Sequence, residues 1–169
     1  MTGDRAAFEG FDRLWTPHRL AYIKPSEPAE GGCPFCVMQA LPVEESLVVA
    51  RGDLCYAVLN LHPYNPGHLM VVPNRHVAEL EELHGDEAAE LMSMTQHAIH
   101  VLKEVSGPHA FNVGLNLGGV AGGSLADHLH QHVVPRWSGD VNFITVVSGT
   151  KVLPQLLADT RELLAQAWA

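Results

Sequence analysis

Positive charge is scarce in this sequence of 169 residues. It has 10 lysines and arginines against 19 aspartates and glutamates, a formal net charge of −9 at pH 7. Proteins that bind nucleic acids or anionic membranes use a basic patch for most of their affinity, so this balance argues against both kinds of partner. A small anionic ligand would have to be held by local donors, such as backbone N–H groups, helix N-termini and imidazoles.

Long apolar runs are absent as well. No stretch reaches the roughly 18 consecutive apolar residues of a membrane span, and the polar, acidic residues 1–10 lack the apolar run of a secretion signal. We therefore expect a cytoplasmic protein with no membrane partner. With 47% hydrophobic and 17% charged residues, the composition is that of a globular domain long enough to bury one substantial core.

Cysteine is too rare for a disulfide framework, since the three cysteines are Cys33, Cys36 and Cys55. In a reducing compartment, the close pair Cys33-Pro-Phe-Cys36 indicates half of a zinc site, a thioredoxin-like redox pair or a coincidence. The redox alternative needs a βαβ setting, which the pattern does not show, and the zinc alternative needs two further ligands. Cys55 lies in an apolar run and is expected to be a buried small hydrophobe.

Histidine, in contrast, is abundant, with 11 residues. His128, His130 and His132 occupy alternate positions of a segment that continues into Val133-Val134. In a β-strand such residues share one face, and Leu129, Gln131 and Val133 would take the other. Three imidazoles in a row make a poor core because each buried ring needs polar partners. The alternatives are a solvent-facing polar row or a functional site.

The remaining patterns predict an α+β fold with a mostly antiparallel sheet of about five strands, one long helix and a C-terminal helix. Strands are expected at 46–50, 54–60, 68–73, 110–116 and the histidine segment, with 141–147 as one further strand. The pattern becomes helical from Val77, with a long helix from Gly85-Asp86 to about 106–108 and a terminal helix at 153–168. Residues 1–32 form an N-terminal extension and linker, and residues 33–169 a single domain.

A glycine-rich segment, residues 118–124, precedes the histidines directly. It has neither the G-x-G-x-x-G spacing nor the lysine of a phosphate-binding loop. By itself it would be a flexible turn. Glycines let backbone N–H groups approach an anion closely, and Asn116 and Ser124 are the flanking polar side chains. Its position beside the histidine row favours a functional role.

Taken together, these motifs resemble the histidine triad (HIT) family of nucleotide hydrolases and transferases. His128-Leu-His130-Gln-His132-Val-Val matches its H-φ-H-φ-H-φ-φ signature, and Pro63 to His76 matches its P-x-x-x-G-H-x-φ-V-x-P-x-x-H segment, with Asn60 just upstream. Gln131 departs from the pattern on the face away from the histidines, which affects packing rather than chemistry. Residues 14–19 and 134–144 look like those of actinobacterial diadenosine tetraphosphate phosphorylases.

This resemblance implies nucleotidyl transfer at the α-phosphate of a dinucleoside polyphosphate through a histidine–nucleotide intermediate. It makes His130 the nucleophile, and His132 and His68 donors to the phosphate. Asn60, Asn116, Gly123 and Ser124 would contact ribose or phosphate. A diadenosine tetraphosphate phosphorylase, which would use inorganic phosphate, is favoured. A HIT-type hydrolase or phosphoramidase and a non-catalytic zinc-stabilised nucleotide-binding module are the alternatives.

The resemblance also implies a structural zinc ion and an oligomer. In zinc-bearing members the ligands match Cys33, Cys36, His76 and His128 of this sequence, which makes His128 a metal ligand rather than a catalytic group. Family members are usually homodimers with the long helix and a strand at the interface, so we expect a homodimer or a larger homo-oligomer.

Overall fold

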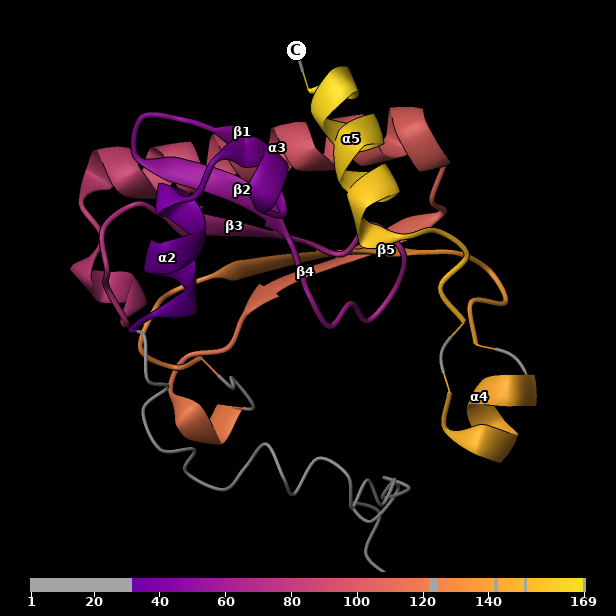
Figure 1. Cartoon of the computed structure of the whole chain (residues 1–169). Helices are drawn as coiled ribbons and strands as arrows, with labels where there is room; N and C mark the ends of the chain where they lie inside the picture. The colour runs from indigo at the N-terminus through magenta and orange to yellow at the C-terminus, as the bar shows by residue number, and fades with distance from the viewer. Residues whose placement is uncertain (1–31, 122–124, 142, 151, 169) are drawn as a thin grey trace, which may run out of the picture.

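The computed structural model describes residues 32–121, 125–141, 143–150 and 152–168. Within them, five strands form one antiparallel sheet in the order β1-β2-β3-β5-β4, with helices lying against it (Figure 1). This arrangement confirms the predicted α+β class and the mostly antiparallel sheet. Apart from Gly32, the predicted extension at residues 1–32 lies outside the described residues.

The strands are β1 (Val48–Arg51), β2 (Cys55–Leu59), β3 (Leu69–Pro73), β4 (Ala110–Leu115) and β5 (Gln131–Arg136). The helices are α2 (Pro34–Ala40), α3 (Gly85–Ser106), α4 (Phe143–Ser148) and α5 (Leu157–Ala167), with 3-10 turns η2 (Val43–Glu45), η3 (Leu80–Glu82) and η4 (Gly119–Ala121). The first four predicted strands are therefore confirmed, with small shifts at their ends. No helix of the described ranges is long and apolar enough to cross a membrane.

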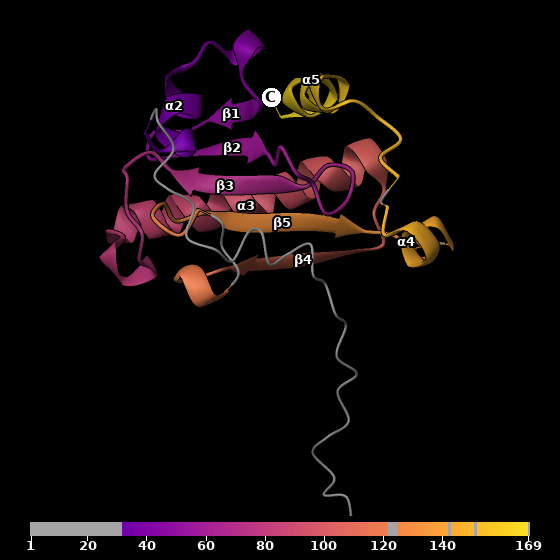
Figure 2. The same ribbon diagram turned by 60° about the horizontal axis from the view of Figure 1, so that its bottom comes forward.

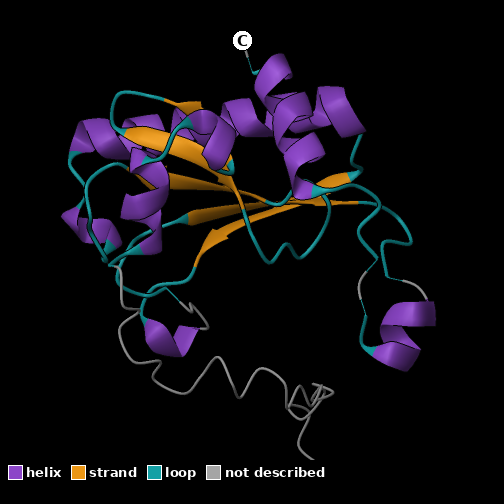
Figure 3. Cartoon of the chain, in the orientation of Figure 1, coloured by secondary structure: helices purple, strands orange, loops and turns teal. Residues whose placement is uncertain are grey.

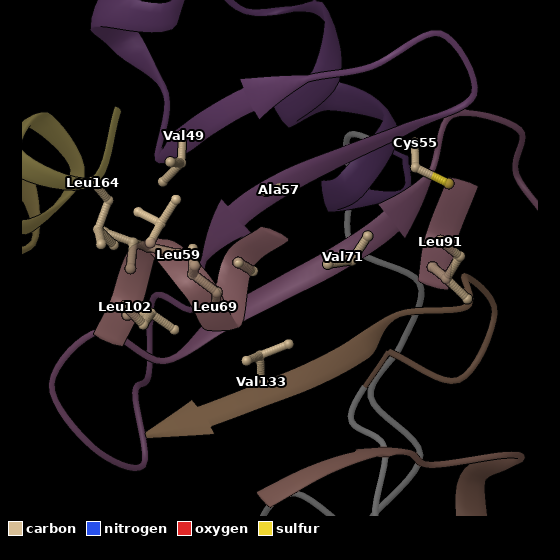
Figure 4. Packing of buried hydrophobic residues seen from close by; sticks show 12 residues of the cluster. Val49, Cys55, Ala57, Leu59, Leu69, Val71, Leu91, Leu102, Val133 and Leu164 are labelled. Carbon is tan, nitrogen blue, oxygen red and sulfur yellow. The ribbon is translucent and has the colours of Figure 1, made fainter. Parts of the chain in front are cut away.

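Strands β2 and β3 lie inside the sheet, and every residue of both is buried. Their sequences are continuous apolar runs because both faces are covered here. On one face, α3 runs along the sheet and α5 closes one end (Figures 2 and 4). This core contains Ala57, Leu59, Leu69, Val71 and Val133 from the sheet, Leu91, Ala98, Val101 and Leu102 from α3, and Leu164 from α5. Cys55 is fully buried in it, as predicted.

The opposite face of the sheet is covered by α2, a helix that the sequence patterns did not predict. Phe35 is the buried residue of this short helix. It packs with sheet residues Val48, Tyr56, Val58, Met70 and Val72. The Tyr56 hydroxyl, also buried, donates a hydrogen bond to the Phe35 carbonyl oxygen over 2.8 Å. This face carries the functional groups described below.

The long helix α3 begins and ends where capping groups predict. At its start, the Glu87 carboxylate accepts a hydrogen bond from the backbone N–H of His84 (2.8 Å) and two from the Arg75 guanidinium (2.7 and 2.9 Å). At its end, Gly107 takes the left-handed conformation, with φ +56°, and its N–H donates to Lys103 O. Glu87 thus ties the first turn of α3 to the segment that follows β3.

Two predicted elements near the C-terminus are wrong in type or extent. The β-branched segment 141–147 is predicted as a strand, but its described residues from Phe143 onward belong to the exposed helix α4, which stands apart from the sheet (Figures 1 and 3). Asp140 holds the preceding turn through Arg136 and Asn65, so the chain leaves the sheet before a strand partner is available. The last helix begins at Leu157 rather than Leu153, and Pro154 disfavours helical backbone at Leu153.

The histidine segment is only partly a strand. β5 begins at Gln131, so His128 and His130 precede it and only His132 lies within it. The predicted separation of faces nevertheless holds. Val133 joins the core under α3, and the buried Gln131 side chain points the same way and donates to Thr95 Oγ1 of α3 over 2.8 Å. A polar residue at this family position is therefore accommodated by a polar partner on the helix.

We predict that Glu87→Gln lowers the free energy of unfolding by about 1–3 kcal/mol at pH 7, because the acceptor that pairs with Arg75 loses its negative charge. Arg75, and then the His84 N–H, lower the pKa of Glu87 to about 2. The contribution is therefore complete above the ordinary value of 4.5 and is lost as the pH falls towards 2. Urea denaturation at several pH values measures this. The exposed Glu81→Gln is the control, and equal stabilities of the two variants would contradict the prediction.

Candidate active site and metal centre

Four side chains from three distant segments converge beside the sheet. Cys33 and Cys36 lie at the start of α2, His76 follows β3, and His128 precedes β5. Their ligand atoms all lie within 4.8 Å of one another. Cys33 Sγ is 3.2 Å from His128 Nδ1, and Cys36 Sγ is 3.4 Å from His76 Nδ1. The C-x-x-C pair and two histidines that are far apart in the sequence thus form one compact cluster.

The chemistry of this cluster fits a tetrahedral metal ion such as zinc. His128 Nε2 donates a hydrogen bond to the carbonyl oxygen of Pro73 over 2.9 Å, so its Nδ1 presents a lone pair to the two sulfur atoms. Burial and the neighbouring Cys33 raise the pKa of the Cys36 thiol, an effect that a bound dication reverses. Two thiolates and two imidazoles complete a closed site of the structural type.

His130 presents a free ring nitrogen. Its Nδ1 lies 2.8 Å from the carbonyl oxygen of His128, so Nδ1 carries the proton and donates it. The other nitrogen, Nε2, keeps its lone pair. Burial lowers the pKa of His130, and the hydrogen bond to His128 opposes this only in part. The imidazole is therefore neutral near pH 7, which is the form required of a nucleophile.

A chain of hydrogen bonds sets the tautomers of two further imidazoles. The backbone N–H of Tyr64 donates to His68 Nδ1 over 3.1 Å, so His68 carries its proton on Nε2. That proton is donated to His132 Nδ1 over 2.9 Å, which places the proton of His132 on Nε2. His132 Nε2 lies 3.3 Å from the amide nitrogen of Asn116. These two donors can share one acceptor, such as a phosphate oxygen.

This chain leaves His68 with no N–H group for a ligand. The residue is 0% exposed and both ring nitrogens have partners within the protein. The sequence-based expectation that His68 donates directly to phosphate stays a prediction, and in this structure the N–H group that remains available belongs to His132. Burial, together with the neighbouring His132, lowers the pKa of His68 to about 3, and burial with His130 lowers that of His132 to about 4.

The other predicted contact residues differ in how they are placed. Asn60 is half-buried, and its side-chain oxygen accepts the backbone N–H of His62 over 2.9 Å, which leaves its amide N–H groups available. Gly123 and Ser124 lie outside the described residues. Neither Phe35 nor Tyr64 was predicted, although both rings lie against the histidines. An aromatic residue between the two cysteines and another just before His68 were the available sequence signs.

A separate cavity of about 400 Å³ lies between the end of α3 and α5. Its walls are mainly apolar, with Leu102, Val105, Trp137, Pro154 and Leu163 among them. None of the five histidines described above lines it, namely His68, His76, His128, His130 and His132. The cavity is therefore distinct from the site built around His130.

We predict that the imidazoles of His68 and His132 stay neutral from pH 8 down to about pH 5.5 in the folded protein, with their protons on Nε2. In the folded protein their pKa values are lowered to about 3 and about 4, whereas in the unfolded chain the same two imidazoles have the ordinary value of 6.5. As the pH falls, they are therefore protonated in the unfolded chain before they are protonated in the folded protein. The free energy of unfolding should therefore decrease as the pH falls below 6.5. Nitrogen-15 NMR of the rings and urea denaturation across this range check both statements. Protonation of either ring in the folded protein above pH 6 would contradict them.

Several known proteins are similar to this chain in sequence and in fold. The HIT domain matches residues 42–139. A protein from Mycobacterium tuberculosis (strain H37Rv) named AP-4-A phosphorylase is 63% identical over 164 residues, 93% of this chain and 84% of that protein. A bis(5'-nucleosyl)-tetraphosphatase (asymmetrical) of Schizosaccharomyces pombe is 35% identical over 56% of this chain and 52% of that protein.

The fold agrees with these sequence matches. The crystal structure of a zinc-bound histidine triad family protein from Mycobacterium smegmatis aligns with a TM-score of 0.65 and 24% identity, over 80% of this chain and 92% of that chain. At this level of identity the likeness shows the fold alone. The HIT-domain match covers more than half of the chain and includes all five histidines of the site, from His68 to His132. The chain belongs to the HIT domain family.

Proposed function

We propose that this protein is a nucleotidyltransferase that acts at the α-phosphate of dinucleoside polyphosphates, most specifically a diadenosine tetraphosphate phosphorylase. The observation that carries the proposal is the free Nε2 of His130 beside the Nε2–H of His132. It occurs in a chain that is 63% identical to a mycobacterial AP-4-A phosphorylase. The substrates would be diadenosine tetraphosphate and inorganic phosphate, and the products ATP and ADP.

In the first step, the lone pair of His130 Nε2 attacks the α-phosphorus. The bond from phosphorus to the bridging oxygen breaks, ATP leaves with that electron pair, and AMP remains on His130 as a phosphoramidate. The His130 Nδ1–H keeps its hydrogen bond to the His128 carbonyl, which stabilises the positive charge that the ring acquires. In the second step, an oxygen of inorganic phosphate attacks the same phosphorus, the P–N bond breaks, and ADP is released.

The remaining residues stabilise and orient the phosphate. His132 Nε2–H and the Asn116 amide would donate to non-bridging oxygens, whose charge grows in the transition state. We propose that Gly123 and Ser124 add donors from the loop and that Asn60 holds the ribose through its free amide. His68 would act through His132 rather than on the phosphate, because both of its nitrogens are engaged.

We further propose that Cys33, Cys36, His76 and His128 bind one structural zinc ion. The compact donor set and the orientation of His128 by Pro73 O support this assignment. Bound there, the ion would join α2, the end of β3 and the segment before β5, and thereby supply folding energy rather than chemistry. The protein would form a homodimer or larger homo-oligomer in the cytoplasm, with residues 33–169 as one domain and no nucleic-acid or membrane partner.

Purified protein should contain about one zinc ion per chain, as measured by inductively coupled plasma mass spectrometry. Cys36→Ser should lose most of the zinc and melt several degrees lower, because bound metal stabilises only the folded state. Cys55→Ala is the matched control, since Cys55 lies in the other core. Equal zinc content in the Cys36→Ser and Cys55→Ala variants would refute the assignment.

The acceptor in the second step distinguishes the main alternatives. Water in place of phosphate gives a hydrolase, and attack on a P–N substrate gives a phosphoramidase, with the same histidines. A non-catalytic nucleotide-binding module would use the same face to hold AMP-like ligands without forming a bond to His130. The free Nε2 of a neutral, buried imidazole favours catalysis over binding alone.

We predict that diadenosine tetraphosphate yields ATP and ADP in a strictly phosphate-dependent reaction, measured by chromatography of the products with and without inorganic phosphate. ATP and AMP formed regardless of phosphate would identify a hydrolase instead. His130→Ala should reduce kcat by about 10⁴-fold or more while binding and fold persist, since no other group can form the covalent intermediate. A module would form no phosphoramidate. A denaturing quench above pH 8, which preserves the acid-labile P–N bond, followed by mass spectrometry of the 125–136 peptide, would reveal whether one forms.

A further inference from the structure

Phe35 lies between the two cysteines of the metal-type cluster and contacts the nucleophile directly. Its ring centroid is 4.9 Å from that of His130, with the planes at 41°, and 5.5 Å from that of His128, with the planes at 71°. The side chain is only 5% exposed and is the buried residue of α2. One aromatic ring therefore touches both a proposed metal ligand and the proposed nucleophile.

The ring of His130 needs such a contact to hold its orientation. Nδ1 makes one hydrogen bond, to His128 O, and Nε2 must stay unpaired to attack phosphorus. A single hydrogen bond fixes the position of Nδ1 but lets the ring tilt about that bond. The tilt decides where the lone pair of Nε2 points. Packing by Phe35 and by His132, whose ring centroid is 4.9 Å away, must therefore set the line of attack.

The position of Phe35 is in turn set by α2, which is held at several points. In its middle, the Phe35 carbonyl accepts the buried Tyr56 hydroxyl over 2.8 Å. At its C-terminal end, the Arg51 guanidinium donates to the carbonyl oxygens of Gln39 and Leu41. At its N-terminal end, the anchors are the side chains of Cys33 and Cys36, which flank Phe35 on either side in the sequence.

We propose that Phe35 is a positioning residue that couples the Cys33–Cys36 cluster to the orientation of the His130 ring. This inference rests on the proposed function in so far as it takes His130 as the nucleophile. When Cys33 and Cys36 share a metal ion with His76 and His128, the start of α2 is clamped and the Phe35 ring is held against His130. Without that clamp, α2 keeps its hydrogen bonds with Tyr56 and Arg51 and its apolar packing on the sheet, and the contact of the Phe35 ring with His130 loosens. In the clamped state, the Cys33–Cys36 cluster thus contributes to catalysis through the packing of one side chain, that of Phe35.

Kinetics of the full-length, zinc-loaded protein provide the first test. Phe35→Leu keeps an apolar side chain in the cluster but removes the ring, and it should lower kcat for diadenosine tetraphosphate about 10- to 100-fold while KM changes less than about 3-fold. Met38→Ala is the matched control, because Met38 belongs to the same helix and the same apolar cluster. Its kcat should stay within about 2-fold of the wild type. Should Phe35→Leu fail to fold, Phe35→Met replaces it.

Proton NMR of the His130 ring provides the second test and does not depend on activity. In the wild type, removal of zinc with a chelator should move the carbon-bound ring protons of His130, since the ring current of Phe35 is displaced. In Phe35→Leu, chelation should move them by less than half as much, whereas Met38→Ala should behave as the wild type. Equal movement with and without the Phe35 ring would overturn the proposal, because zinc would then act on His130 through the His128 backbone.

The two readouts separate the two levels of inference. If the wild type does not cleave diadenosine tetraphosphate with either phosphate or water as the acceptor, the proposed function is refuted. The NMR comparison still decides the role of Phe35 in that case. If the wild type turns over normally and Phe35→Leu has the same kcat and KM as Met38→Ala, the positioning role is refuted. The proposed function then still stands.

Discussion

Each imidazole at the centre of this site has one ring nitrogen whose role is set, directly or through a neighbour, by a backbone group. His128 donates to Pro73 O, His130 donates to His128 O, and the Tyr64 N–H fixes His68 and, through it, His132. A backbone carbonyl can only accept and an N–H can only donate, so each bond determines the tautomer. These bonds leave a lone pair on Nδ1 of His128 and on Nε2 of His130, and they place the proton of His132 on Nε2.

Of those backbone groups, Pro73 O lies at the end of β3, and the others lie in the segments that lead into β3 and β5. The central strands β2 and β3 are covered on both faces, and the chain enters β5 beside β3 with Val133 and Gln131 anchored to the α3 side. The histidines therefore lie on the face of the sheet that α2 covers in part. Residue 128 serves two functions at once, with its ring facing the cysteines and its carbonyl holding the ring of His130. Structural and catalytic groups are thereby separated by only two residues.

The sequence predicted the sheet better than the segments around it. His128, His130 and His132 were predicted to alternate along one strand, but β5 begins at Gln131 and only His132 lies within it. The 141–147 segment had strand propensity but no neighbouring strand, and it became helix α4. The short helix α2 has seven residues, too few for a periodic pattern, so only contacts with the sheet reveal its role. Phe35 and Tyr64 were not predicted either, because their roles depend on ring contacts with the histidines.

By itself, the sequence determined the fold class, the order of the strands along the chain, the bounds of α3 and the group of histidines and cysteines that carries the chemistry. Composition, periodicity and spacing are local properties, and these features depend on them. Only the tertiary structure decided which nitrogen of each imidazole carries the proton, that His68 donates to His132, and that Phe35 contacts His130. These features depend on hydrogen bonds and ring contacts between residues 2 to 95 positions apart, which spacing alone does not specify.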